Sequence, residues 1–352
     1  MKNSKDILNK VGDSDIKRTS NICSTQPARW SRRHVLMHIG ASLAALATPG
    51  LLRAQSDRPI KFILPVGVGS GVDTITRSAS EALSRALGHT VVVENQPGAG
   101  GIVGTSALVR SPADGYTLSM VSNNHVIFPS VYKSLPFDPL ADITPISVVG
   151  TSPLVLVTNS ARIKAQTASE LIALLKAHPD DYNYASSGNG TILQLAVEMF
   201  LLQSGTKARH IPYKGVGPMV TDLLSGQVDL GVLSVASIRS HLESGALQAI
   251  GYCGIERSAA LPNIPTLREQ GMSNYNVEGW IAAVGPAKLP AENVQRVYRA
   301  FSEAFNTPEV KAAMATQGNV IKLMPPDRTK EFFKSEMRKY AEIVEGAHIE
   351  KM

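Results

Sequence analysis

Three loops of this sequence combine glycine with small polar residues, each after an apolar run and before a helical pattern. They cover residues 65–73 (PVGVGSGVD), 122–124 (SNN) and 186–191 (SSGNGT). Glycine lets the backbone turn sharply and leaves its N–H groups uncovered. Such N–H groups, together with the positive end of the following helix dipole, can bind an anion without a charged side chain. The loops therefore predict a carboxylate site built on main-chain amides.

The candidate ligand-binding residues are the members of these loops. They are Val66, Gly67, Val68, Gly69, Ser70, Gly71, Asp73, Ser122, Asn123, Asn124, Ser186, Ser187, Gly188, Gly190 and Thr191. Asp73 is also placed to cap the next helix. Several charge-assisted bonds of roughly 1.5–3 kcal/mol each can supply the about −8 kcal/mol of micromolar affinity. Each loop taken alone is also typical of an ordinary turn.

Signals of catalysis are weaker than signals of binding. The sequence holds no H-E-x-x-H, C-x-x-C or G-x-S-x-G pattern. Three histidines share no metal-ligand spacing and are expected at the surface or in packing: His125, His178 and His210. A serine nucleophile needs a base, and the sequence points to none. We expect no metal, no cofactor and no enzymatic activity; an exported hydrolase using Ser187 or Asp73 is the alternative.

Two further features have an ordinary interpretation and a functional one. Residues 98–104 follow a strand pattern and open a helix, as a dinucleotide-binding fingerprint does, but G-x-G-x-x-G from Gly98 requires glycine where Val103 stands. Tight packing of the helix on the preceding strand is therefore expected.

Trp280, within EGWIAAVGP, is expected to be a core or hinge aromatic or a wall of the ligand site.

Short β-branched runs alternate with helical patterns along residues 55–352. Strands are expected at 60–64, 91–94, 116–121, 154–158, 183–185, 230–233 and 247–252, and helices at 74–87, 102–109, 167–178, 192–204, 216–225, 290–306, 308–317 and 327–344. This alternation predicts an α/β fold of two lobes, each a mixed, mostly parallel sheet flanked by helices. We expect lobe 1 at 55–155 plus 281–352 and lobe 2 at 156–280, with the ligand cleft between them.

Residues 1–54 are typical of an export signal. Arg32 and Arg33 precede an apolar run at 37–52 that lacks acidic residues, and a small-residue exit follows near Ala54. The run is shorter than the ~20 residues that a membrane-spanning helix needs. We expect a twin-arginine signal that is removed near Ala54, with a buried N-terminal helix or a retained anchor as alternatives.

Charge and cysteine content exclude several classes of protein. The chain has 35 Lys and Arg and 29 Asp and Glu; residues 1–54 hold nine and three of these, which leaves 26 of each sign in residues 55–352. Nucleic-acid binding is therefore not expected, because it needs a basic footprint on the folded domain.

Of the two cysteines, Cys23 leaves with the signal, and Cys253 is expected to be a small buried hydrophobe without a disulfide.

Seven motifs in a fixed order give the chain a family resemblance. They are RPI at 58–60, VVENQPGAGG at 92–101, PADGYTL at 112–118, YASSGNG at 184–190, IPYKG at 211–215, DLLSGQVD at 222–229 and LPNIPT at 261–266. With them the chain resembles the solute receptors of the tripartite tricarboxylate transporter family, often called the Bug family. The likeness covers nearly all of residues 55–352.

The resemblance implies a monomeric periplasmic receptor of the two-lobed Venus flytrap kind, with no catalysis. Its ligand would be a small carboxylate (a di- or tricarboxylate, an amino acid or an aromatic acid), gripped by amides of the first and third loops. Tyr213 and Asp229 would lie near the cleft in lobe 2. The partner would be a membrane permease; a sensor that signals to another membrane partner is the alternative.

The first loop departs from the family pattern P-F-x-P-G-G-x-x-D at three positions. Val66 replaces phenylalanine and thereby removes an aromatic ledge, Val68 replaces proline, and Ser70 replaces the second glycine. Ser70 is expected either to add a hydroxyl donor or to fill space.

Overall fold

The computed structural model describes residues 58–346 and 349–352. The predicted export signal lies outside these residues. Within the described ranges, none of the helices combines the length and the apolar character that a membrane crossing requires.

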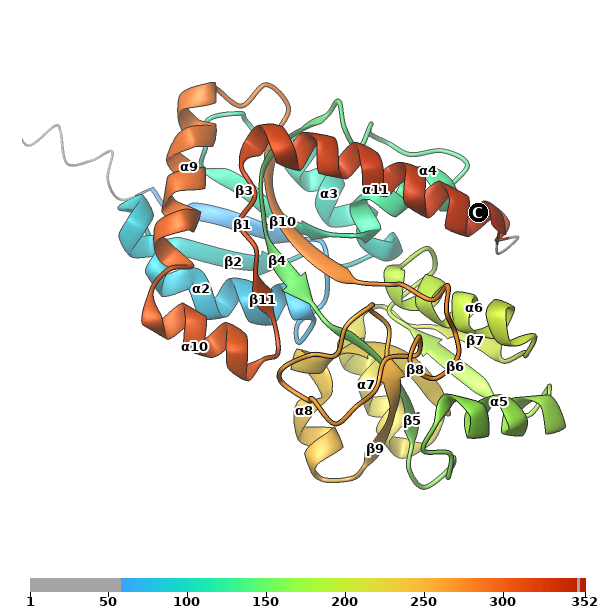
Figure 1. Ribbon diagram of the computed structural model, residues 1–352. Helices are drawn as coiled ribbons and strands as arrows, with labels where there is room; N and C mark the ends of the chain where they lie inside the picture. The colour runs from blue at the N-terminus through green and yellow to red at the C-terminus, as the bar shows by residue number, and fades with distance from the viewer. Residues whose placement is uncertain (1–57, 347–348) are drawn as a thin grey trace, which may run out of the picture. The chain divides into compact units, whose positions relative to one another are not determined.

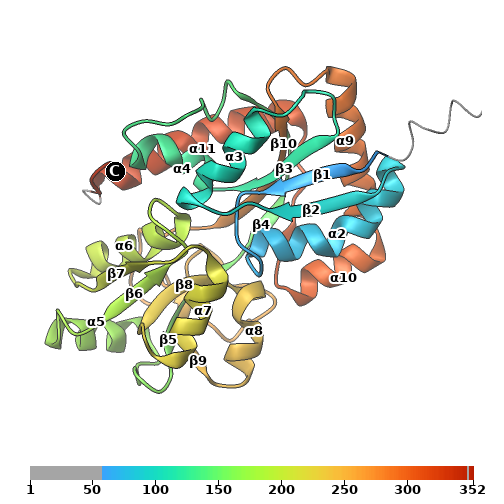
Figure 2. The ribbon, with the colours of Figure 1, turned by 180° about the vertical axis from the view of Figure 1, so that it is seen from behind.

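Six strands form the first sheet, in the order β11-β4-β10-β3-β1-β2. They are β1 (Ile60–Leu64), β2 (Val91–Asn95), β3 (Thr117–Ser122), β4 (Ile143–Ser152), β10 (Gly279–Pro286) and β11 (Val320–Ile321). One face carries α2 (Gly71–Leu87), α9 (Ala291–Ala304) and α10 (Pro308–Thr316), and the other carries α3 (Ile102–Val109), α4 (Asn124–Val131) and α11 (Pro326–Gly346). Figures 1 and 2 show α11 lying along α4. We call this sheet with its helices lobe 1.

Five strands form the second sheet, in the order β7-β6-β8-β5-β9. They are β5 (Leu154–Asn159), β6 (Asn183–Ser186), β7 (Arg209–Pro212), β8 (Leu230–Ser234) and β9 (Leu247–Tyr252). The helices α5 (Ala168–Ala177), α6 (Ile192–Ser204), α7 (Val216–Ser225) and α8 (Val235–Glu243) flank it (Figure 1). We call this sheet with its helices lobe 2.

The predicted two-lobed α/β fold is confirmed, and parallel pairing covers part of each sheet. The parallel pairs are β2-β1-β3 and β7-β6-β8, whereas β4, β5 and β10 pair antiparallel with their neighbours. The chain changes sheet at Pro153 and again between Tyr252 and Gly279. The lobe boundaries near residues 155 and 280 remain a prediction.

Two apolar clusters hold these layers together. One lies between the first sheet and α2, α9 and α10; the other runs from the core of lobe 2 to the face under α4 and α11. Cys253 is fully buried in the second cluster, as expected, and burial raises the pKa of its thiol to about 12. Gly104 lies inside α3 and lets this helix pack closely, because a Cβ there would come within 2.7 Å of Pro65 Cα and 2.8 Å of Gln96 O. The expected tight packing of α3 is found, but it involves Pro65, directly after β1, as well as Gln96, directly after β2.

Candidate functional site

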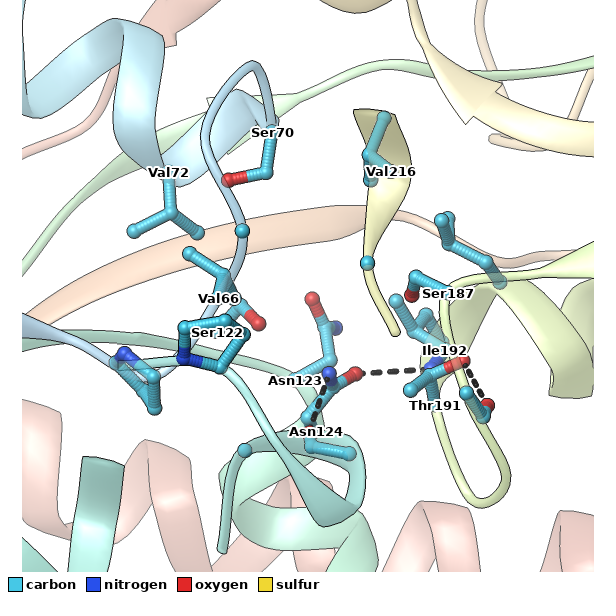
Figure 3. A pocket seen from close by; sticks show the side chains of 18 of the residues that line it. Val66, Ser70, Val72, Ser122, Asn123, Asn124, Ser187, Thr191, Ile192 and Val216 are labelled. Carbon is cyan, nitrogen blue, oxygen red and sulfur yellow. Dashed lines mark hydrogen bonds between the residues drawn. The ribbon is translucent and has the colours of Figure 1, made fainter. Parts of the chain in front are cut away.

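A pocket of about 430 Å³ lies between the two lobes. From lobe 1 it is lined by the loops that precede α2, α4 and the short 3-10 helix η3 (Ala99–Gly101); from lobe 2 it is lined by the loops that precede α6 and α7. Figure 3 shows Val66 and Ser122 of lobe 1 facing Ser187 and Val216 of lobe 2. The strands that connect the lobes complete the lining at Leu154 and Trp280. A pocket of this size suits a small metabolite.

Four helices present their N-termini to this pocket. Gly71 opens α2, Asn124 opens α4, Ile192 opens α6 and Val216 opens α7, and all four residues belong to the lining. The first N–H groups of a helix have no partner within it and carry its positive dipole end. Among the described residues of the lining, Lys214 is the one charged side chain, and it is exposed. The pocket is therefore suited to an anion held mainly by main-chain amides.

The first loop is organised by its own side chains. The cap of α2 is Ser70, whose hydroxyl accepts from Asp73 N at 3.2 Å, so the expectation that Asp73 caps this helix is wrong. The Asp73 carboxylate, 3% exposed, instead accepts from Gly69 N at 3.0 Å and pairs with Arg77 Nε at 2.9 Å. Ser70 thus shapes the loop rather than simply filling space. Val68 points away and is 64% exposed.

Asn123 fixes the floor of the pocket to the connecting strand and to α11. Its amide nitrogen donates to Glu278 O at 3.0 Å and to the Tyr340 hydroxyl at 2.6 Å, and its oxygen accepts from Trp280 N at 2.9 Å. Burial is the first cause of a raised Tyr340 pKa. All three contacts are internal, so the Asn123 side chain is a structural hub.

Asn124 connects the two lobes. Its amide nitrogen donates to Gly100 O at 3.1 Å in lobe 1, and its oxygen accepts from Ile192 N at 2.9 Å in lobe 2 (Figure 3). A second close approach places Gly67 against Gly215, because a Cβ on Gly67 would lie 3.6 Å from Gly215 Cα. The two lobes are therefore in contact across the pocket, which is the closed arrangement.

The third loop is held by Ser186, which is fully buried and does not line the pocket. Its hydroxyl accepts from Gly188 N at 3.2 Å and lies 2.6 Å from His210 Nε2. The His210 ring stacks on Tyr184, and burial lowers its pKa to about 4. Thr191 donates to Gly188 O at 2.8 Å. The loop conformation therefore depends on internal hydroxyl contacts.

The two residues that the family resemblance added have different positions. Tyr213 lines the pocket, and its hydroxyl donates to Asp222 at 2.8 Å; burial first, and this carboxylate second, raise its pKa to about 12. Asp229 lies outside the lining. Its buried carboxylate accepts hydrogen bonds from Arg162 Nε at 3.0 Å and from Asn183 N at 2.8 Å.

The pocket lining separates the predicted residues into two groups. Eleven line it: Val66, Gly67, Ser70, Gly71, Ser122, Asn123, Asn124, Ser187, Gly188, Thr191 and Tyr213. Six do not: Val68, Gly69, Asp73, Ser186, Gly190 and Asp229. In the described part of the chain, the Ser122 and Ser187 hydroxyls make no hydrogen bond, so they can serve a ligand together with the amides.

Comparison with known proteins decides the family. The family model described as "Tripartite tricarboxylate transporter family receptor" matches residues 75–349. The chain belongs to this receptor family. Protein BugT of Bordetella pertussis (strain Tohama I) is 34% identical over 316 residues, which is 89% of this chain and 97% of BugT.

Two solved structures share the fold of this receptor. The periplasmic binding protein BugD superposes with a TM-score of 0.81 at 28% identity, covering 84% of this chain and 99% of BugD. R. palustris Rpa4515, solved with adipate, gives a TM-score of 0.81 at 24% identity and covers 84% and 99% of the two chains. The second likeness shows the fold alone.

Sequence reasoning missed one whole wall of the receptor pocket. Residues 97–101 line it, and the Tyr132 hydroxyl beside them donates to Asn189 O at 3.1 Å across the lobes. The run of glycines was the available signal, because Gly98, Gly100 and Gly101 all have positive φ. Met352 also belongs to the lining, and no sequence pattern indicated that.

Proposed function

We propose that this protein captures a small carboxylate between its lobes outside the cytoplasmic membrane and delivers it, chemically unchanged, to a tripartite tricarboxylate-type permease. The convergence of four helix N-termini on one closed pocket carries the proposal. Such termini stabilise an anion through fixed dipoles and N–H donors. Membership of the receptor family and the adipate in a structure of the same fold agree with it.

The contacts of Ser186 argue against hydrolysis by this serine. His210 stands at hydrogen-bond distance from its hydroxyl, the arrangement that a nucleophile and its base require. Ser186 has no exposed surface and is absent from the lining, so a solute in the pocket does not reach it. The pair therefore supports the loop and does not attack the ligand.

A cognate carboxylate should raise the melting temperature of the protein. At a concentration a hundred times Kd, binding adds about 2.7 kcal/mol, which corresponds to about 5 °C for a chain of this size. We would measure thermal unfolding with succinate, adipate, citrate, glutamate and benzoate. Adipamide, which has the length of adipate without its charge, is the matched control. Unchanged melting with every carboxylate would contradict the proposal.

The location rests on the twin-arginine pattern of residues 31–36. Replacing Arg32 and Arg33 together with lysine should keep the precursor in the cytoplasm, because that pathway reads the arginine pair. Fractionation followed by immunoblotting would show it, with Arg29→Lys as the control. Export of the double variant at the normal level would point to a different route.

A further inference from the structure

Met352 and Lys351 are attached to the end of α4 in lobe 1. Met352 N donates to Val131 O at 2.9 Å, and Lys133 N donates to Met352 O at 2.9 Å. The Lys351 ammonium donates to Pro129 O at 2.8 Å. These contacts give the Met352 side chain a defined position beside the pocket.

The Met352 side chain extends from that anchor towards lobe 2. A Cβ built on Gly190, in the third loop, would lie 2.6 Å from Val131 Cγ2, 3.3 Å from a Tyr132 ring carbon and 3.4 Å from Met352 Cε. Gly190 has a φ of +70°, so it also accommodates the conformation of the turn. Met352 is 43% exposed, which means that one side faces solvent while the other faces the pocket and lobe 2.

The surroundings place this side chain where the two lobes meet. Tyr132 of lobe 1 donates to Asn189 O of lobe 2 immediately before Gly190, and Tyr132, Asn189 and Met352 all line the pocket. A thioether on three rotatable bonds adapts its shape to what it covers. Met352 therefore forms an adaptable part of the pocket wall at the junction of the two lobes.

We propose that Met352 is a specificity-determining residue, whose thioether limits the room for the ligand body between Tyr132 and the third loop. This inference rests on the proposed function, because it concerns the same pocket. The carboxylate is held by amides that do not distinguish one carboxylate chain from another. Discrimination then depends on the apolar wall, where each buried methylene contributes about 0.8 kcal/mol.

The test compares the wild-type protein with Met352→Gly, both as full chains. Calorimetric titration with succinate, glutarate, adipate, pimelate and suberate gives the dissociation constant as a function of ligand length. We expect the preferred length to increase by at least one methylene. The best wild-type ligand should bind roughly four- to fifteenfold more weakly, the effect of losing one or two methylene-sized contacts. Met337→Gly, at a half-buried methionine outside the lining, is the matched control.

A second measurement needs no ligand. Hydrogen exchange of residues 187–193 should accelerate fivefold or more in Met352→Gly and stay unchanged in Met337→Gly, because only the first variant removes support from this loop. If no dicarboxylate binds either protein, linear dicarboxylates are excluded as ligands while the wider carboxylate class of the proposed function is not, and the exchange rates alone decide whether Met352 braces the loop. Unchanged length preference in a protein that binds, or unchanged exchange, overturns the proposal.

Discussion

Replacing Gly188 with valine should weaken carboxylate binding at least about a hundredfold, or 2.7 kcal/mol, in a protein that still folds. Gly188 lines the pocket with a φ of +134°, and its absent Cβ would lie 3.4 Å from Tyr213 O and 3.8 Å from Gly100 N of lobe 1. Valine would place two methyl groups beyond that point, where the lobes and the ligand approach the backbone. Calorimetric titration with the best carboxylate of the thermal screen measures the loss.

A control variant at a second glycine separates the effect of filling the pocket from the effect of backbone strain. Gly205 ends α6 with a φ of +61°, and nothing lies within 4 Å of a Cβ built on it. Gly205→Val therefore carries a left-handed backbone strain of roughly 1–3 kcal/mol outside the pocket lining, and should reduce stability without changing affinity. If Gly188→Val has wild-type circular dichroism and binds within threefold of wild type, residues 186–191 do not hold the ligand.

Stability should fall by about 3 kcal/mol between pH 6.5 and pH 4 because of one histidine. His125 is 1% exposed, its Nε2 lies 2.7 Å from Pro139 O, and burial lowers its pKa from 6.5 to about 4. A carbonyl only accepts, so Nε2 carries the proton of the neutral ring. Nδ1 is buried without a partner among the described residues, and protonating it would place a charge among Phe128, Phe137 and Phe333.

The direction of this dependence follows from proton uptake. Below pH 6.5 the unfolded chain binds a proton at this position, while the folded protein does not until about pH 4, so acid favours unfolding over that interval. His210, with its pKa also lowered to about 4 by burial, adds a smaller effect of the same sign because its ring is partly exposed. Nearby Asp138 opposes the shift of His125.

Urea unfolding at several pH values, in wild type and His125→Gln, isolates this contribution. Glutamine retains a donor for Pro139 O but binds no proton, so the variant should lose less stability on acidification. His178→Gln, at an exposed histidine, is the control and should behave like the wild type. Parallel pH curves for wild type and His125→Gln would show that the buried imidazole does not govern the acid response.

Local patterns predicted those helices and strands whose spacing of apolar and polar residues is visible in the sequence alone. The strands at 60–64 and 247–252 and the helix at 102–109 have the predicted bounds. The prediction missed β10, because all eight of its residues are buried and it therefore shows no alternation. It also missed α4, where Pro129 lies inside a helix buried on almost every side. Both elements sit at the centre of the lobe, where tertiary packing overrides local preference.

The sequence located the loops of the site but did not show which of their side chains contact the ligand and which stabilise the fold. Glycine marks the places where the backbone is accessible, and that signal is local. The amide of Asn123 is engaged by Glu278 and Tyr340, which are 155 and 217 positions away. Such partners are set by the folded topology, so a polar residue in a binding loop can equally be a ligand contact or a structural hub.

The passage from β4 to β5 through Pro153 alone makes this point of the molecule a pivot. A single residue with a fixed φ provides little slack, so we expect any opening of the lobes to be a rotation about this point rather than a translation. Ser152 and Leu154, which flank Pro153 and line the pocket, stay near the axis of that rotation. We therefore expect the loops remote from Pro153 to move furthest when a solute enters or leaves.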